Sequence, residues 1–344
     1  MKNGFEGKNI LVTGGTGSIG LEIVKQLLKY KPNVIRIFAR HEDRHHHVMQ
    51  ELGNDRLRFI IGDIRDKDRL RMAMEDVDIV FHAAALKHVP LCEYNPFEAV
   101  KTNIIGTQNV IESAREQKVK QVISISTDKV VDPTGVLGVS KLMGEKLSLA
   151  PYFCQESDEK TKFSCVRFGN VLGSRGSILP LIKKQIFEKG EVTITDPDMT
   201  RFVMTIPQAV KLVLSASSMM HGREIFILKM PSVRLGDLVK AAVEYYAPLA
   251  GKQASDIKLK FIGKRAGEKV HERLLADYEI DKALETKDMY VLASTTMKSI
   301  LEGKHDSIYS IVGKGVGGKD FFSEHAPHLS HNELVVLIKE ADVF

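Results

Sequence analysis

The stretch Asn9-Ile10-Leu11-Val12-Thr13-Gly14-Gly15-Thr16-Gly17-Ser18-Ile19-Gly20 decides the fold. Its first five residues form an apolar run typical of a buried strand, and Leu21, Val24 and Leu28 follow with helical spacing. Glycines between a strand and a helix permit a tight turn and let backbone amides approach a pyrophosphate. A plain βα turn is the alternative, but the strand, the turn, the helix and the position near the N-terminus all agree. We therefore predict that a dinucleotide cofactor is bound by Thr13, Gly14, Thr16, Gly17, Ser18, Ile19 and Gly20.

Further apolar runs continue the same alternation along the first half of the chain. Strands are predicted at residues 34–39, 57–61, 79–83 and 121–126, and their near-continuous hydrophobicity indicates strands buried on both faces of a parallel sheet. Helical spacing recurs at Phe97, Val100, Ile104, Ile111 and Ala114. The fold class is thus α/β: a Rossmann-type doubly wound parallel sheet with a smaller C-terminal substrate lobe.

Beyond Arg167 the pattern loosens into segments interrupted by glycine and proline, as expected for a lobe built from insertions. We predict that residues 1–172 form the NADP-binding Rossmann domain, that residues 205–229 return to it, and that residues 173–204 and 230–344 form the substrate lobe. Helices are expected near residues 178–189 and 235–246. Ser330 and Glu333 have the spacing of a capping box, which predicts a short closing helix.

Composition excludes several classes of protein. No apolar run approaches the roughly 20 residues of a membrane-spanning helix and no signal-peptide core is present, so we expect a cytoplasmic protein without membrane partners. The net charge of +5 comes from basic residues scattered among acids, which argues against nucleic-acid binding. Cys92, Cys154 and Cys165 are widely spaced and lack a Cys-x-x-Cys pattern, so we interpret them as buried thiols rather than disulfides or zinc ligands.

The residues after the second strand bear on the choice of cofactor. NAD-binding versions of this loop need an acid at the end of that strand for the ribose 2′-hydroxyl, but Arg40 stands there and suits the 2′-phosphate of NADP, with Arg44 as a second candidate. Asp63 is expected to meet the adenine, or else to act only as a helix N-cap. Ile64 and Ala83 complete the predicted cofactor site.

The triplet His45-His46-His47 invites a metal site, but it lies on a polar stretch without further ligands nearby in sequence. We interpret the triplet as a solvated helix face and predict no metal.

The chain from about Asn9 to Ile338 resembles the bacterial UDP-N-acetylglucosamine 4,6-dehydratases, enzymes of polysaccharide, flagellin-sugar and capsule synthesis. The stretches that carry the resemblance are Ala84-Ala85-Leu86-Lys87-His88-Val89-Pro90, Glu93-Tyr94-Asn95-Pro96, Thr102-Asn103, Ser126-Thr127-Asp128-Lys129, residues 167–177 (RFGNVLGSRGS), Met199-Thr200-Arg201-Phe202 and Arg265-Ala266-Gly267-Glu268-Lys269. The resemblance implies an NADP-dependent lyase that acts on a UDP-sugar and forms a homo-oligomer, a dimer or a hexamer.

The catalytic helix departs from the superfamily pattern Tyr-x-x-x-Lys. Lys141 occupies the lysine position and is expected to hold the nicotinamide ribose, but Leu137 replaces the tyrosine and cannot titrate. The resemblance implies that Asp128 is the acid for the departing 6-hydroxyl and Lys129 the base for the carbon 5 proton. Asp128, positioned by Thr127, is then our candidate for the 4-hydroxyl proton as well. For Lys129 to act as a base its pKa must fall, which we expect from burial and from Lys141.

The resemblance also implies a nucleotide-binding surface, and other activities stay open. The residues expected to bind the UDP-sugar are Lys87, Asn170, Ser177, Arg201, Arg265 and Glu268. Short inverting members of the family keep the tyrosine and many retaining members lack it, so the stereochemistry at carbon 5 is undecided. The alternatives are a related UDP-sugar step, such as 5-epimerisation or processing of a 5,6-ene or 4-keto intermediate, and a non-catalytic NADP-binding regulatory protein. The acid–base pair argues against the last.

Overall fold

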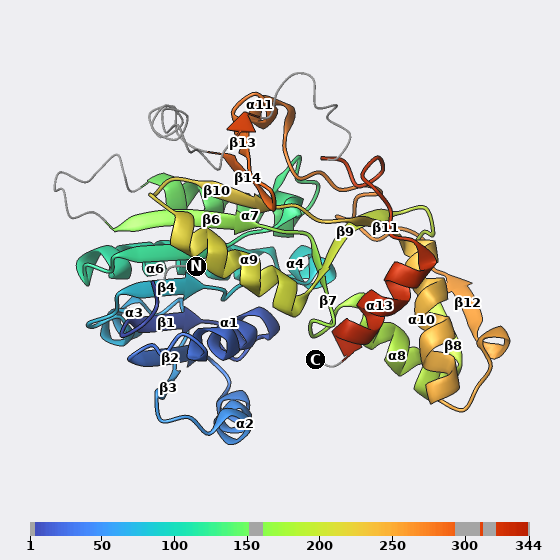
Figure 1. Cartoon of the computed structure of the whole chain (residues 1–344), viewed down its shortest axis with the longest axis horizontal. Coiled ribbons are helices and arrows are strands. Elements are labelled where there is room, and N and C mark those ends of the chain that lie inside the picture. The colour runs from blue at the N-terminus through green and yellow to red at the C-terminus, as the bar shows by residue number, and fades with distance from the viewer. Residues whose placement is uncertain (1–3, 151–160, 293–309, 312–320, 343–344) are drawn as a thin grey trace.

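The computed structural model describes residues 4–150, 161–292, 310–311 and 321–342, and its main feature is a large twisted sheet with a smaller lobe at one end (Figure 1). The strands of the main sheet are, in spatial order, β15 (Ser310–Ile311), β13 (Ala283–Glu285), β14 (Met289–Leu292), β10 (Ile225–Leu228), β6 (Lys162–Arg167), β5 (Gln121–Ile125), β4 (Ile79–His82), β1 (Asn9–Thr13), β2 (Val34–Ala39) and β3 (Leu57–Ile61).

Strand direction in this sheet confirms the predicted fold class. From β3 to β10 all neighbouring strands are parallel, whereas β14, β13 and β15 are added antiparallel at one edge. The order reverses between β1 and β4, where the chain first runs outward through β2 and β3 and then returns. In doubly wound sheets the crevice at such a reversal, beyond the carboxyl ends of the strands, is where ligands bind.

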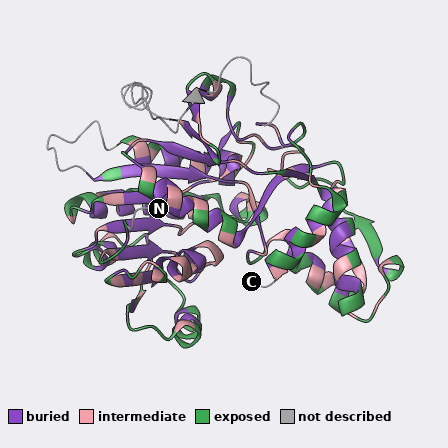
Figure 2. Ribbon diagram, in the orientation of Figure 1, coloured by how far each residue is buried: buried purple, intermediate pink, exposed green. Residues whose placement is uncertain are grey.

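Helices cover both faces of the main sheet, so its central strands β10, β6, β5, β4 and β1 are largely buried, as Figure 2 shows. On one face α1 packs against α9, and on the other α3 packs against α6 and α6 against α7. Each face has its own apolar core, centred on Ile23 and Val210 on one side and on Leu70 and Val110 on the other. The helices of this part are α1 (Ser18–Leu28), α2 (Glu42–Leu52), α3 (Lys67–Ala73), α4 (Val89–Tyr94), α5 (Pro96–Ala99), η1 (Val100–Ile105), α6 (Gly106–Glu116), η2 (Asp128–Val130), α7 (Val136–Leu149), α9 (Ile206–Met219) and α11 (Asp277–Ile280).

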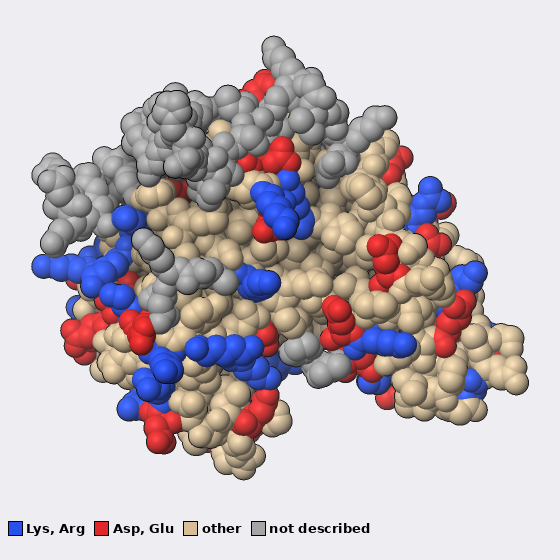
Figure 3. Space-filling model, in the orientation of Figure 1, with Lys and Arg blue, Asp and Glu red and all other residues tan. Residues whose placement is uncertain are grey.

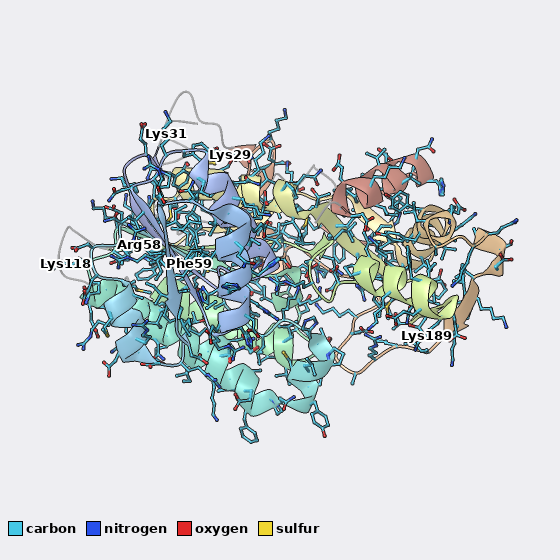
Figure 4. The ribbon with its side chains drawn as sticks, turned by 90° about the horizontal axis from the view of Figure 1, so that it is seen from below. Lys29, Lys31, Arg58, Phe59, Lys118 and Lys189 are labelled. Carbon is cyan, nitrogen blue, oxygen red and sulfur yellow. The ribbon has the colours of Figure 1, made fainter. Side chains whose placement is uncertain are left out.

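The smaller lobe has a separate apolar core between short sheets and three helices. Ile182, Val239 and Ile338, one from each helix, are fully buried in it. Its elements are β7 (Asn170–Leu172), α8 (Ile178–Lys189), β8 (Glu191–Ile194), β9 (Thr200–Thr205), β11 (Ser232–Arg234), α10 (Leu235–Leu249), η4 (Ala254–Asp256), β12 (Lys258–Phe261) and α13 (His331–Asp342). Figure 4 shows the length of the molecule, with Lys118 after α6 at one end and Lys189 of α8 at the other.

Most predicted elements lie within a residue or a few of their expected bounds, and the closing helix has the predicted cap. The backbone N–H of Ser330 donates to Glu333 at 2.8 Å, and the Glu333 N–H donates back to the Ser330 hydroxyl at 3.4 Å. Residues 283–292, assigned from sequence to the substrate range, instead extend the main sheet as β13 and β14.

The helical face predicted around Phe97 is wrong in its first half. Phe97 is 80% and Val100 43% exposed, whereas Ile111 and Ala114 are buried as expected. The reason is that η1 is a π-helix, whose extra residue per turn rotates the side chains before it away from the face that follows.

Two smaller expectations have mixed outcomes. Cys92 and Cys165 are buried free thiols as predicted, and Cys154 lies outside the described residues. His45, however, is not solvated: it is buried, its Nε2 lies 3.0 Å from the carbonyl of Ala39, and its ring meets Phe59 edge-on. The contact with the Ala39 carbonyl at the end of β2 explains why the side chain of His45 points inward.

The surface carries charged side chains of both signs. Basic and acidic side chains are interleaved over the face drawn in Figure 3. Within the described ranges, the structure has no helix long and apolar enough to cross a bilayer. The described side chains also include no group of three or more His, Cys, Asp or Glu that could hold a metal ion.

Candidate active site

A cavity of about 350 Å³ lies at the reversal of the sheet, beside the glycine loop. The predicted cofactor residues that line it are Gly14, Thr16, Gly17, Ser18, Ile19, Gly20, Arg40, Asp63, Ile64 and Ala83. Thr13 is not part of the lining; it is fully buried, with its hydroxyl 2.7 Å from Nδ1 of His82. Lys141 is also not part of the lining; its ammonium donates to the Ile125 carbonyl at 2.5 Å.

The glycine loop is shaped for an anionic group. Gly14 has φ +67°, and a Cβ there would lie 2.8 Å from the backbone nitrogen of Ala84, while a Cβ on Gly20 would lie 2.3 Å from the carbonyl oxygen of Gly14. Helix α1 begins after Gly17 without a side-chain cap, which leaves N–H groups of its first turn for a ligand. These features fit a dinucleotide pyrophosphate.

Charged side chains surround the far end of this cavity. The Arg40 guanidinium is 45% exposed and lies 3.7 Å from the Asp63 carboxylate, which Arg65 also binds at 2.7 Å. Burial raises the pKa of Asp63, but the hydrogen bonds and charge of Arg65, together with Arg40, outweigh it and lower the pKa. Asp63 does not cap α3, because Asp66 does so by accepting from the Arg69 N–H at 3.0 Å.

Arg175 lines the same cavity and was given no role from sequence. It lies on the loop after β7, its backbone N–H donates to the Ser18 hydroxyl at 3.0 Å, and its guanidinium donates to the Thr16 carbonyl. The smaller lobe therefore contacts the glycine loop directly. The sequence signal was present, since Arg175 lies within the matched stretch 167–177.

The predicted acid–base pair lies just past the carboxyl end of β5, in η2. The Lys129 ammonium is 3.0 Å from Oδ1 of Asp128, which is fully buried and also accepts from the Thr127 hydroxyl at 3.0 Å. Lys129 donates in addition to Oδ1 of Asn170 at 3.2 Å, so one predicted substrate residue meets the pair. Burial raises the pKa of Asp128, as does the carboxylate of Glu272, which favours proton uptake by Asp128.

The expectation that the pKa of Lys129 falls is wrong in this structure. Burial does lower it, but the carboxylates of Asp128 and Glu272 outweigh burial and raise it. Sequence reasoning missed Glu272, whose Oε1 lies 3.3 Å from the Lys129 ammonium. Its only signal was its position three residues after the matched stretch Arg265–Lys269.

Leu137 is packed against Cys92 and Ala99 in a small apolar cluster. It also lines a cavity of about 10 Å³, near the lower limit for one water molecule, whose other walls include Lys129, Lys269 and Glu272. The position of the family tyrosine thus adjoins ionisable groups from another segment of the chain.

Of the remaining predicted substrate residues, Lys87 lines one of these cavities, whereas Ser177, Arg201, Arg265 and Glu268 line neither. Lys87 lines the cofactor cavity and lies 3.4 Å from the Ser174 hydroxyl, and burial lowers its pKa. Ser177 precedes α8, and its buried hydroxyl has no hydrogen-bond partner among the described residues. Arg265 and Glu268 face each other at 3.9 Å on one loop, with the Arg265 guanidinium partly exposed.

Arg201 is engaged differently from the prediction. Its guanidinium donates to the carbonyls of Thr200, Val270 and Lys269 at 2.7, 2.8 and 2.9 Å. It therefore holds the segment that follows Arg265 and Glu268, and most of its donors are used within the protein.

The fold, the glycine loop and the lysine of α7 define a Rossmann-type protein of the extended short-chain dehydrogenase/reductase class. The chain belongs to the polysaccharide biosynthesis protein family, whose model matches residues 10–294. It is 42% identical to an inverting UDP-N-acetylglucosamine 4,6-dehydratase of Campylobacter jejuni, over 99% of this chain and 100% of the relative.

Other relatives carry different names. An uncharacterized membrane protein of Methanocaldococcus jannaschii is 56% identical over 85% of this chain and 87% of its own length. A UDP-glucose 4-epimerase of Rickettsia bellii is 43% identical over 83% of each chain. The solved structure of Pen from Bacillus thuringiensis has a TM-score of 0.87 and 42% identity, covering 97% of this chain and 98% of that one. The named relatives thus include both dehydratases and epimerases of nucleotide sugars.

Proposed function

We propose that the protein is an NADP-dependent UDP-N-acetylglucosamine 4,6-dehydratase, a hydro-lyase that forms a UDP-4-keto-6-deoxy sugar for surface polysaccharide synthesis. The coarser assignment, to nucleotide-sugar dehydratases and epimerases that use a nicotinamide cofactor, rests on the family. The finer one rests on a single observation: the ion pair between buried Asp128 and partly buried Lys129 at the end of β5, where both lobes meet.

Removal of water from carbons 5 and 6 needs a base for the carbon 5 proton and an acid for the departing 6-hydroxyl. When bound, the nicotinamide supplies the hydride acceptor for carbon 4 and the donor for carbon 6. Asp128 takes the 4-hydroxyl proton, which its raised pKa favours, and then gives that proton to the leaving hydroxyl. Lys129 removes the carbon 5 proton and returns a proton, exchangeable with solvent, to carbon 5 when carbon 6 receives the hydride. The hydroxyl of Thr127 holds Asp128 in place. Asp128 thereby carries out both proton transfers, whereas Leu137, which has no titratable group, can carry out neither.

The cofactor and nucleotide contacts are part of this proposal. Arg40 takes the 2′-phosphate of NADP, and the helix N-terminus after Gly17 takes the pyrophosphate. Arg265 and Glu268 bind the UDP group, supported by Arg201 behind them. Lys87 and Asn170 orient the sugar between the two cavities.

The epimerase names in the family make a second candidate. Epimerisation at carbon 4 needs oxidation and return of the hydride at that carbon, but no base for carbon 5. The close approach of Lys129 to Asp128 therefore favours the dehydratase.

One experiment separates the two functions. Purified protein is incubated in deuterated water with NADP and with UDP-N-acetylglucosamine that carries a hydrogen isotope on carbon 4. The product is analysed by NMR. We expect a 4-keto-6-deoxy product with the carbon 4 label at carbon 6 and solvent deuterium at carbon 5. Recovery of a carbon 4 epimer without solvent deuterium would reject the dehydratase and favour the epimerase.

A further inference from the structure

Three oxygen atoms surround the ammonium of Lys129, and each comes from a different segment. They are Oδ1 of Asp128 at 3.0 Å, Oδ1 of Asn170 at 3.2 Å and Oε1 of Glu272 at 3.3 Å. A lysine ammonium has three N–H donors, so this arrangement matches the charged form of the side chain. Asp128 belongs to the Rossmann part, whereas Glu272 lies far along the chain, after β12.

Glu272 is buried, whereas most glutamate side chains lie at the protein surface. It is 2% exposed, and its backbone N–H donates to the Ser323 hydroxyl at 2.8 Å. Its second oxygen, Oε2, accepts no hydrogen bond from the described residues and has only the Lys269 ammonium at 3.7 Å. Burial of a carboxylate costs several kcal/mol unless a partner compensates. Lys129 is the partner at closest range.

Several charged groups face this carboxylate. Lys129, Arg201 and Lys269 are the cations, and Asp128 is the other carboxylate of the cluster. Burial raises the pKa of Glu272, but the three cations outweigh it and lower the pKa, so Glu272 is an anion at neutral pH. The charged Lys129 therefore lies between two carboxyl groups whose pKa values are shifted in opposite directions. The pKa of Glu272 is lowered, whereas burial raises the pKa of Asp128.

We propose that Glu272 is a positioning residue that holds Lys129 in its charged form and thereby sets the pH at which Lys129 becomes a base. The inference rests on the proposed function for the role of Lys129, but not for its charge. Glu272 acts through Lys129 and is assigned no contact with substrate.

This arrangement orders the two proton transfers. As long as both carboxylates are charged, Lys129 keeps its proton and cannot attack carbon 5. When Asp128 takes the 4-hydroxyl proton, Lys129 loses one of its two anionic partners and its pKa falls. The ammonium, which is 24% exposed, then releases its proton to solvent, and the neutral amine can act as the base. Oxidation at carbon 4 thus precedes removal of the carbon 5 proton, which becomes acidic only next to the new carbonyl group.

The charge of Lys129 is measured directly in the full-length protein. Lysines are labelled with carbon-13 at Cε, and the Lys129 signal is assigned by its absence in Lys129→Met. Because Gln keeps the shape and an acceptor oxygen but loses the charge, Glu272→Gln should lower the pKa of Lys129 by at least about one unit, the size of a nearby opposite charge. Glu272→Asp keeps the charge and should restore most of the shift. Glu324→Gln, on the same part of the chain but about half exposed, is the matched control and should leave Lys129 unchanged.

The catalytic consequence is measured as exchange of the carbon 5 proton with deuterated solvent at a series of pH values. In Glu272→Gln the acidic limb of this profile should move to lower pH by about the same amount as the Lys129 titration, while the KM for UDP-N-acetylglucosamine changes less than twofold. A uniform loss of rate with an unmoved limb would mean that Glu272 is only structural.

The two proposals fail in different ways. An unchanged Lys129 titration in Glu272→Gln overturns the role of Glu272, whatever the substrate. If Glu272→Gln does not fold, Glu272→Ala decides, because removal of the carboxylate must likewise lower the pKa of Lys129 by at least about one unit. Absence of any conversion of UDP-N-acetylglucosamine by the unaltered protein overturns the proposed function, while the titration still tests Glu272.

Discussion

The guanidinium of Arg167 makes a two-pronged ion pair with Glu145, with Nε to Oε2 at 3.0 Å and Nη2 to Oε1 at 2.5 Å, and both side chains are buried. The same guanidinium also binds Glu279 of α11 at 2.7 Å. Arg167 thus ties the last residue of β6 to α7 and to a segment far along the chain.

We expect Arg167→Met to destabilise the protein by about 3–5 kcal/mol, because it leaves two buried carboxylates without their cation. Denaturant-induced unfolding followed by circular dichroism measures this loss. Lys120→Met is the control: its ion pair with Asp78 is 2.8 Å long but exposed on the lysine side, and the change should cost less than about 1 kcal/mol. Equal losses in the two variants would contradict the importance of burial.

Asp128→Asn should lower turnover of UDP-N-acetylglucosamine by at least about a hundredfold, because the amide keeps the shape but can neither take nor give the proton. Steady-state rates by NMR or chromatography measure the effect. Leu137→Phe should have a smaller effect, since neither side chain moves a proton. Near-normal turnover in Asp128→Asn would transfer the role to Thr127 or to a bound water.

Lys129→Met should differ in kind from Asp128→Asn. The uncharged chain fills the same space but leaves no base near carbon 5, so incorporation of solvent deuterium at carbon 5 should disappear. Mass spectrometry of recovered substrate and product detects the label. Retained incorporation would exclude Lys129 as the base and turn attention to Glu272.

Arg40→Ala should remove the preference for NADP over NAD. The side chain is 45% exposed, so we expect the lower end of the range for a hydrogen bond to a charged group, about 1.5 kcal/mol or roughly tenfold in Kd. Fluorescence titration with both cofactors provides the comparison, and Arg58→Ala on β3 serves as a control. Equal affinities in the unaltered protein would show that Arg40 does not select the cofactor.

Arg265→Ala and Arg201→Ala should have different effects, because Arg265 is proposed to bind UDP whereas Arg201 stabilises the backbone of the site. The Arg265 guanidinium is 43% exposed and lies 3.9 Å from Glu268, so it can also contact a ligand, and its loss should weaken UDP binding in calorimetry with little effect on NADP. Arg201 is bound to three backbone carbonyls, and its loss should lower thermal stability as well as UDP affinity. The opposite pattern would move Arg265 out of the substrate site.

His82 gives a prediction for acid stability. Its ring lies between the hydroxyls of Thr13 and Thr107, and burial, aided by the charge of Lys141, lowers its pKa from 6.5 to about 3. The unfolded chain therefore takes up a proton below pH 6.5 that the folded chain refuses until about pH 3. Stability should fall with decreasing pH in this window by up to about 1.4 kcal/mol per pH unit from this group. His82→Gln, less stable at pH 7, should show a shallower fall in denaturant titrations.

The sequence predicted the fold well because the first half of the chain repeats one pattern. Short, mostly apolar runs such as Val34–Ala39 are typical of strands covered on both faces, and the glycines of the loop match contacts that a Cβ would obstruct. The rotation at η1 was not predictable, since a π-turn leaves no clear mark in the spacing of apolar residues. That is why Phe97 was misassigned.

Site residues that follow a predicted strand could be predicted from the sequence, whereas a residue that reaches the site from far along the chain could not. Asp128 follows the end of β5 and Asn170 follows the end of β6, and the carboxyl ends of these neighbouring parallel strands lie together. Glu272 reaches Lys129 through a fold of the chain over more than a hundred residues, which no local pattern encodes. Its effect reversed the expected direction of the Lys129 pKa, because a nearby carboxylate outweighs burial.

The placement of β10 beside β6 has a consequence for biosynthesis. A ribosome makes β6 long before β10, and the antiparallel strands β14 and β13 emerge later still. Until then the nascent sheet exposes an unpaired strand edge, the kind of surface that invites aggregation. The Rossmann half cannot be completed as the first product of translation, and truncation after residue 172 should yield a chain that depends on chaperones rather than an independent cofactor-binding module.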